Sequence, residues 1–380
     1  MPHSKQRYLF IDLLRFLAVV FMIQGHTFDA LLDFNLRSHT LFFAHDFFHG
    51  FIAPMFLFAS GVAFGISTMK KWDEHNRPTR HVAKRFGKFI GLLIIGYALH
   101  LPYFSLRKIL AEATPADIAV LLQVDALHCI AITMLILQCA VILLKDERRF
   151  TLVTAAAAVI IIFLSPIVWS IDFTKIVPLW LVSYINAGNN SWFPLFPWSA
   201  YILCGVIFAS IFLNAKEHRH AMDLMQKAVS VGIVMLITAV ILLNIPLNIY
   251  PPHDVWKVNP LIIFARLGFV LLVTSGVFFA EYSLKITSKI PQIMGRESLF
   301  IYIIHLIILY GSVVNNGLQQ VILPTLSVVE SSLAFIIVFV AISCFAYGWY
   351  HLKKQYVYAA MAVRISVAGT FMYLFLTRPY

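Results

Sequence analysis

Apolar runs of about 20 residues recur along the whole chain, and each is long enough to cross the hydrocarbon core of a bilayer. Hydrophobic residues make up 60% of the chain and charged residues 12%, whereas a soluble domain carries about 25% charged residues. We therefore predict an all-α, polytopic integral membrane protein of about 11 transmembrane helices in a single membrane-embedded domain, residues 1–380. The expected helices are 8–32, 47–69, 87–106, 117–144, 151–171, 194–213, 229–249, 261–284, 297–313, 326–350 and 356–376.

The charge pattern sets the orientation. Most of the 29 Lys and Arg residues fall in alternate connecting segments, which by the positive-inside rule places the N-terminus in the cytoplasm. The same bias explains the net charge of +11 without a nucleic-acid partner. The first apolar segment is too long for the hydrophobic region of a signal peptide. All four cysteines fall in apolar segments and are expected to be small core residues, and no metal is expected.

Ionisable residues follow one face of the first apolar segment. Arg15 and His26 are eleven positions apart, which at about 100° per residue places them within roughly 20° of one helix face. Asp12 and Asp29 lie within about 60° of that face. Such groups are costly in a membrane and usually line a pathway or a site. The alternative is that Asp12 and Arg15 anchor the helix at the interface while His26 reaches outward. The stripe favours a site, in which Asp29 or Asp33 would orient the His26 ring.

Several motifs follow in a characteristic order. The first segment carries Ile11-Asp12 and Arg-x10-His. Later come FFHGFIAPMFLFASGVAFGIS (47–67), VDALHCIAITMLIL (124–137), FPLFPWSAYILCGVIF (193–208) and GRESLFIYIIHLIILYG (295–311). Together they resemble the transmembrane acyltransferase superfamily. The resemblance is greatest to the heparan-alpha-glucosaminide N-acetyltransferase catalytic-domain family, and more distant to the acyltransferase-three family.

The resemblance implies a membrane acyltransferase. It would move an acyl group, often acetyl, from cytoplasmic acyl-CoA to a hydroxyl or amine of a sugar or glycan acceptor on the extracytoplasmic side. Acetyl-CoA would be the donor substrate. A neutral imidazole with a pKa near 6.5 suits proton removal at neutral pH, so we expect His26 to act as general base and Arg15 to position the donor. A covalent acyl-histidine step stays open. Asp12 and Asp29 complete the expected catalytic group on this helix.

Other polar residues extend the expected site. Asp125 and His128 form an i, i+3 pair that we assign to the acceptor site, whereas His100 is expected at the interface. Guanidinium and ammonium groups bind phosphate well, so the predicted donor contacts are Arg15, Arg80, Lys84, Arg85, Arg296 and His305. The basic residues near position 80 equally fit the positive-inside rule, and His305 equally fits a core histidine. His45 and His49 could bind zinc on a helix, but no HExxH motif accompanies them.

Two glycine pairs, Gly61 with Gly65 and Gly87 with Gly91, have the GxxxG spacing that predicts close helix packing.

The chain shows no evident internal repeat, which argues against the alternative function, a secondary transporter or exporter of a small anion or sugar. We expect a bacterial cytoplasmic (inner) membrane and a role in cell envelope glycan modification. Besides acyl-CoA and a carbohydrate or small-molecule acceptor, the partners considered are membrane lipid and a second copy of the chain.

Overall fold

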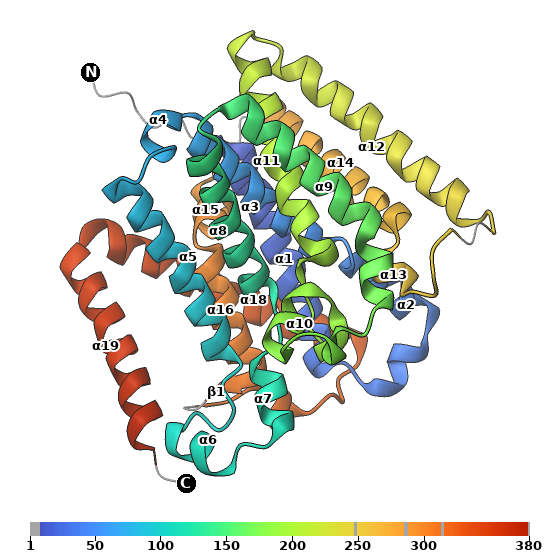
Figure 1. Cartoon of the computed structure of the whole chain (residues 1–380). Coiled ribbons are helices and arrows are strands. Elements are labelled where there is room, and N and C mark those ends of the chain that lie inside the picture. Colours follow the sequence, from blue (N-terminus) through green and yellow to red (C-terminus); the bar gives the residue numbers. More distant parts are fainter. Residues whose placement is uncertain (1–7, 247–248, 285–287, 313–314, 379–380) are drawn as a thin grey trace. The chain divides into compact units, whose positions relative to one another are not determined.

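The computed structural model describes residues 8–246, 249–284, 288–312 and 315–378, and nearly all of its regular structure is helical (Figure 1). Within these ranges nine helices are long and apolar enough to cross a membrane, and one bent helix pair would make a tenth span. The chain is thus an all-α integral membrane protein, although the expected count of eleven is not confirmed. Its described strands are β1 (Gly311–Ser312) and β2 (Asn315–Asn316), which pair antiparallel.

Nine expected segments correspond to long apolar helices. They are α1 (Leu9–Leu31), the run Thr40–Met69 that joins α2 (Thr40–His49) to α3 (Ile52–Met69), α8 (Ala126–Leu144), α9 (Glu147–Ser170), α11 (Leu195–Glu217), α12 (Ala221–Leu243), α14 (Pro260–Leu284), α18 (Val328–Gln355) and α19 (Val357–Thr377). The expected segments 229–249 and 297–313 include positions 247–248 and 313, which lie outside the described residues.

The other expected segments differ in their boundaries. The segment 87–106 corresponds to α5 (Arg80–Leu99), whose first turns carry several basic residues that separate it from the long apolar helices. The segment 297–313 corresponds to α16 (Ser298–Tyr310), which follows α15 (Lys289–Arg296) at a bend of 78°. The segment 117–144 is interrupted, because α7 (Pro115–Leu121) ends and Asp125 then caps α8. The short helices are α4 (Trp72–His75), α6 (Leu106–Glu112), α10 (Leu179–Ile185), α13 (Val255–Val258) and α17 (Leu318–Ile322), with 3-10 turns at Phe34–Ser38, Phe173–Lys175 and Ala187–Asn189.

The described residues form two compact units. Unit 1 holds the chain up to Phe56 and the range Gly276–Arg378. In it α1 packs against α15, α16 and α18, and their apolar side chains form a buried core. Gly295 allows α15 to cross α1 closely, because a Cβ at that position would lie 2.1 Å from the carbonyl oxygen of Asp12. The core includes Val19, Ile23, Leu31, Met294, Ile301, Leu309, Val338 and Ile342.

Unit 2 spans Leu57–Ser275, and α11 packs within it against α8 and α9. The prediction of close packing at Gly61 and Gly65 is confirmed. A Cβ at Gly61 would lie 2.0 Å from the Ile202 carbonyl oxygen of α11, and one at Gly65 would lie 2.6 Å from the Cβ of an alanine on the same helix. The same prediction is wrong for Gly87 and Gly91, where a Cβ would meet no atom within 4 Å among the described residues.

Candidate functional site

His26 lies on α1 and contacts a tyrosine of α16 within unit 1. His26 Nδ1 is 3.1 Å from the Tyr310 hydroxyl, and the same hydroxyl is 3.1 Å from Asp29 Oδ2. Arg37 follows α1 and brings its Nη1 to 3.5 Å from Asp29. The sequence predicted that Asp29 or Asp33 would orient the His26 ring directly. The structure places Tyr310 between Asp29 and His26, while Asp33 caps the 3-10 turn that follows α1.

The Tyr310 hydroxyl decides which nitrogen of His26 is basic. A phenol has one hydrogen and an ionised carboxylate only accepts hydrogen bonds, so Tyr310 donates to Asp29. The phenol oxygen then accepts the hydrogen on His26 Nδ1, which leaves the lone pair of the neutral ring on Nε2. Nε2 has no hydrogen-bond partner among the described residues. The arrangement therefore leaves the basic nitrogen of the His26 ring open to a ligand from outside the described residues.

His305 lies beside this relay. Its ring centroid is 5.1 Å from that of His26. His305 Nδ1 donates to the Ile301 carbonyl at 3.0 Å, so its lone pair is also on Nε2, which is buried and unpartnered within the described ranges. The sequence left a donor contact and a core histidine open for His305, and its complete burial fits a residue that packs against the His26 ring.

A third polar group joins α1 to α2. Gln24 Oε1 accepts a hydrogen bond from His49 Nε2 at 2.7 Å, and the Gln24 amide nitrogen lies 2.8 Å from His45 Nε2. Gly25 makes room for His49, because a Cβ there would lie 1.9 Å from the imidazole Cε1. The two histidines thus bind an amide, and no group of three or more His, Cys, Asp or Glu in the described part of the chain could hold a metal ion. Sequence reasoning missed Gln24, although a polar residue two positions before His26 was a usable signal.

The ionisable residues in the N-terminal half of α1 belong to a separate group. Asp12 is buried and its Oδ2 lies 3.7 Å from Arg296 Nε, while Arg15 is half-buried one turn further along. The distance along α1 from Asp12 to His26 is about 21 Å at the rise per residue of a helix. Asp12 and Arg15 therefore cannot contact Nε2 of His26. Of the expected catalytic residues on α1, the structure brings together His26 and Asp29 through Tyr310.

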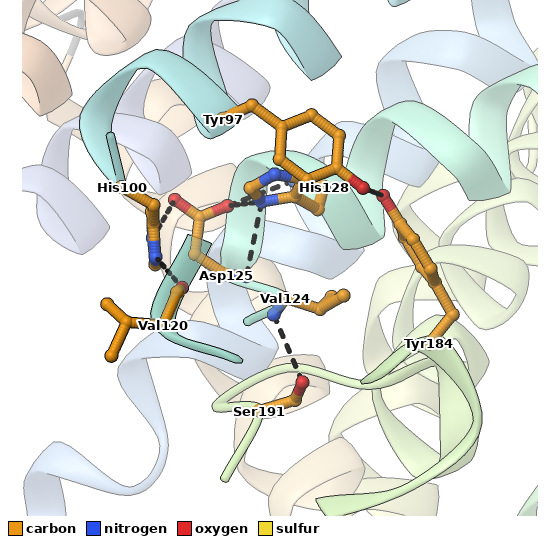
Figure 2. Close-up of polar contacts among 8 residues, drawn as sticks. All are labelled: Tyr97, His100, Val120, Val124, Asp125, His128, Tyr184 and Ser191. Carbon is orange, nitrogen blue, oxygen red and sulfur yellow. Dashed lines mark hydrogen bonds and ion pairs between the residues drawn. The ribbon is translucent and has the colours of Figure 1, made fainter. Parts of the chain in front are cut away.

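Asp125 and His128 form a close pair in unit 2, as Figure 2 shows. Asp125 Oδ1 accepts from the His128 backbone N–H at 3.0 Å and lies 2.7 Å from His128 Nδ1, while His100 Nε2 is 3.6 Å from Oδ2. Burial alone would raise the pKa of Asp125, but hydrogen bonds from His100 and His128 hold that pKa below its usual range. The ionised carboxylate at 2.7 Å is a stronger partner of His128 Nδ1 than the Asp125 backbone N–H at 3.3 Å. Nδ1 therefore donates to the carboxylate, and the buried Nε2 carries the lone pair.

Two tyrosines and a glycine complete this pair's surroundings. The Tyr97 ring lies edge-on to His128 at 4.3 Å between centroids, and its hydroxyl is 2.9 Å from the Tyr184 hydroxyl (Figure 2). Burial, together with the hydrogen bond to Tyr97, raises the pKa of Tyr184. A Cβ at Gly96 would lie 2.7 Å from His128 Cε1. Sequence reasoning missed Gly96 and Tyr97 of α5 and the pairing of His100, which caps the end of α5, because these residues meet the pair only in the fold.

The predicted donor contacts of α5 lie in different environments. Arg80 and Lys84 are exposed in its first turns, where Arg80 helps to line a hollow of about 380 Å³. Arg85 turns inward, where its Nη2 donates to Thr68 Oγ1 at 3.0 Å and its guanidinium lies 4.5 Å from the centre of the Phe64 ring. Arg85 thus joins α5 to α3, whereas Arg80 and Lys84 can reach a ligand from solution.

Comparison with known protein families matches residues 7–245 to the catalytic family of heparan-alpha-glucosaminide N-acetyltransferase. Comparisons with curated proteins and with solved structures give no significant match. The matched range holds α1 with His26 and α8 with Asp125 and His128, and it covers more than half of the chain. The resemblance seen in the sequence is thereby confirmed, and the chain belongs to the heparan-alpha-glucosaminide N-acetyltransferase catalytic family.

Proposed function

We propose that this membrane acetyltransferase moves an acetyl group from acetyl-CoA to a hydroxyl or amine of a sugar or glycan acceptor, with His26 as the reactive base. The proposal depends mainly on one observation, the relay in which the Tyr310 hydroxyl donates a hydrogen bond to Asp29 and accepts one from His26 Nδ1. The relay fixes the ring so that its lone pair lies on Nε2, which has no partner among the residues that the structure describes. Family membership also favours an enzyme over the transporter or exporter considered from the sequence.

In the proposed reaction His26 Nε2 takes the proton of the acceptor hydroxyl or amine. The acceptor oxygen or nitrogen attacks the thioester carbonyl, the carbon–sulfur bond breaks, and the leaving thiolate receives the proton from Nε2. The imidazolium formed in between is stabilised through Tyr310 by the charge of Asp29. If His26 Nε2 attacks the thioester first, the carbon–sulfur bond breaks, the CoA thiolate leaves and an acetyl-histidine forms. The acceptor then attacks the acetyl carbonyl, the bond from the carbonyl carbon to Nε2 breaks, and the acceptor's proton passes to the thiolate.

We further propose that the donor enters from the cytoplasm and that the acceptor binds on the outer side, with the N-terminus inside. Arg80 and Lys84 would bind the donor phosphates, because they are exposed at the start of α5. Arg15 and Arg296, the donor contacts predicted in unit 1, lie on α1 and α15. The single-domain organisation, the role of Asp125 and His128 at the acceptor and the bacterial inner membrane remain part of this proposal.

The test uses the purified full-length protein and acetyl-CoA labelled in the acetyl group. His26→Ala should lower transfer by about 10²–10⁴-fold, the usual contribution of a general base. Tyr310→Phe keeps the ring volume but removes the hydroxyl that joins Asp29 to His26, so it should lower kcat by about tenfold or more. Tyr282→Phe is the matched control, because Tyr282 is 71% exposed on α14.

Labelled protein trapped without acceptor would assign the acetyl-histidine route, provided that His26→Ala abolishes the label. Full activity of His26→Ala in folded, membrane-inserted protein would refute the assignment of the base. Accumulation of a sugar in proteoliposomes without consumption of acetyl-CoA would refute the enzymatic function itself.

A further inference from the structure

A buried arginine of unit 2 lies outside the matched family range and outside the His26 relay. Arg266 is the seventh residue of α14, about 9 Å along the helix from its first residue. Only 8% of its surface is exposed, and its Nη1 is buried without a hydrogen-bond partner within the described ranges. Arginine stays ionised in proteins, so the site holds a full positive charge at membrane depth.

No acidic side chain of the chain neutralises this charge. All 18 Asp and Glu residues fall within the described ranges, and none brings a carboxylate oxygen to within 4.0 Å of Arg266. A cation inside a membrane is energetically costly, and it is normally paired with an acidic side chain or with backbone carbonyls. Arg266 therefore carries a buried positive charge that no carboxylate of the protein neutralises by a salt bridge.

Aromatic residues with unsatisfied polar groups surround the guanidinium. Arg266 lies 5.6 Å from the centre of the Trp198 ring, and Trp198 lies 5.9 Å from the Tyr201 ring. The guanidinium is close enough to the Tyr201 hydroxyl for an electrostatic interaction, although no hydrogen bond of normal geometry joins them. Trp198 Nε1 and the Tyr201 hydroxyl are both buried without partners among the described residues. A cation–π contact stabilises the charge but leaves all three donor groups unsatisfied.

We propose that Arg266, Trp198 and Tyr201 form an anion-binding site that takes a carboxylate or phosphate group of the acceptor. An anion there would accept hydrogen bonds from a guanidinium, an indole N–H and a phenol, and it would neutralise the buried charge. The acceptor would then be an acidic sugar or a sugar phosphate. Its assignment as acceptor rests on the proposed acetyltransferase function, whereas anion binding does not.

Two other anions fit the site less well. The donor CoA carries several phosphate charges, and a single guanidinium in a closed environment suits one charge. A lipid headgroup needs an open surface, whereas Trp198 is 7% exposed and Tyr201 fully buried.

The experiment measures the thermal unfolding midpoint of the full-length protein in neutral phosphatidylcholine nanodiscs. The probes are glucuronate, glucose 1-phosphate and, as the uncharged control, glucose. A ligand that binds the folded state raises the midpoint, so both anions should raise it and glucose should not. Arg266→Met should abolish the shift, while Trp198→Phe and Tyr201→Phe, which each remove one donor, should weaken binding about tenfold. The matched control is Trp180→Phe, because Trp180 is 54% exposed.

Arg266→Met should also unfold at the same or a higher midpoint without ligand, because it removes an unpaired buried charge. This expectation separates loss of binding from loss of folding. Equal anion shifts in wild type and Arg266→Met would overturn the site, as would a shift that appears only with added phosphatidylglycerol. If the anions bind through Arg266 but no acetyl transfer occurs, the site stands and the proposed function fails. If transfer occurs and neither anion binds, the site fails and the function stands.

Discussion

Gly96→Ala tests whether the geometry around His128 is as tight as the structure indicates. The new Cβ would lie 2.7 Å from His128 Cε1, 2.9 Å from Nδ1 and 3.0 Å from Nε2. Ordinary van der Waals contact begins at 3.4 Å, so the imidazole must move by about 0.7 Å. A shift of this size in the direction away from Asp125 would stretch the 2.7 Å contact between His128 Nδ1 and Asp125 Oδ1 to the edge of hydrogen-bond range.

Overpacking of this kind costs about 1–3 kcal/mol of folding stability. Gly91→Ala is the matched control in the same helix, since a Cβ there meets no atom within 4 Å among the described residues. It should stabilise the protein by about 0.5–1 kcal/mol, because alanine favours the helix over glycine. The two variants should therefore differ in the free energy of unfolding by about 1.5–4 kcal/mol in detergent or nanodiscs. Equal stability of the two variants would refute the close packing of α5 on His128.

The remaining predictions concern other close contacts and pH. Gly295→Ala should destabilise the protein by at least about 1 kcal/mol, since its Cβ would meet the Asp12 carbonyl oxygen at 2.1 Å. Gly369→Ala is the control and should not destabilise it, because a Cβ there has no described atom within 4 Å. Equal unfolding midpoints of the two variants would contradict this prediction. Asp125→Asn should cost about 1–3 kcal/mol at pH 7. The pKa of Asp125 in the folded protein is held below its usual range. The ionised carboxylate therefore contributes fully to folding stability above about pH 4, and this contribution is lost only as the pH falls through the lower pKa of the folded state. The stability difference between wild type and Asp125→Asn should thus persist from pH 7 to pH 5, and its disappearance over that range in unfolding experiments would count against an ionised, hydrogen-bonded carboxylate.

The sequence predicts what depends on local periodicity. Among the described residues, nine long helices follow from apolar length. The Asp125–His128 pair follows from its i, i+3 spacing, but the sequence placed it inside the helix 117–144, whereas in the structure Asp125 is the N-cap of α8 and its carboxylate reaches the third residue of that helix. The partner of His26 does not follow from spacing. Asp29 is also three positions away from His26, but Tyr310 of α16, almost 300 positions later, occupies the space between them. Contacts of this kind depend on tertiary packing, which a single sequence does not reveal.

The local chemistry of three histidines is similar, and their burial distinguishes them. His26, His128 and His305 each have Nδ1 engaged by an oxygen, from Tyr310, Asp125 and Ile301 respectively, so each neutral ring is basic at Nε2. His128 and His305 are 0% exposed, and their Nε2 atoms are buried. Neither can take a proton from an acceptor unless the surrounding helices move. His26 is partly exposed, so of these three histidines it can meet a substrate without such a rearrangement. This difference in burial is the strongest reason to expect that substitution of His26 lowers the rate of the chemical step more than substitution of His128 or His305.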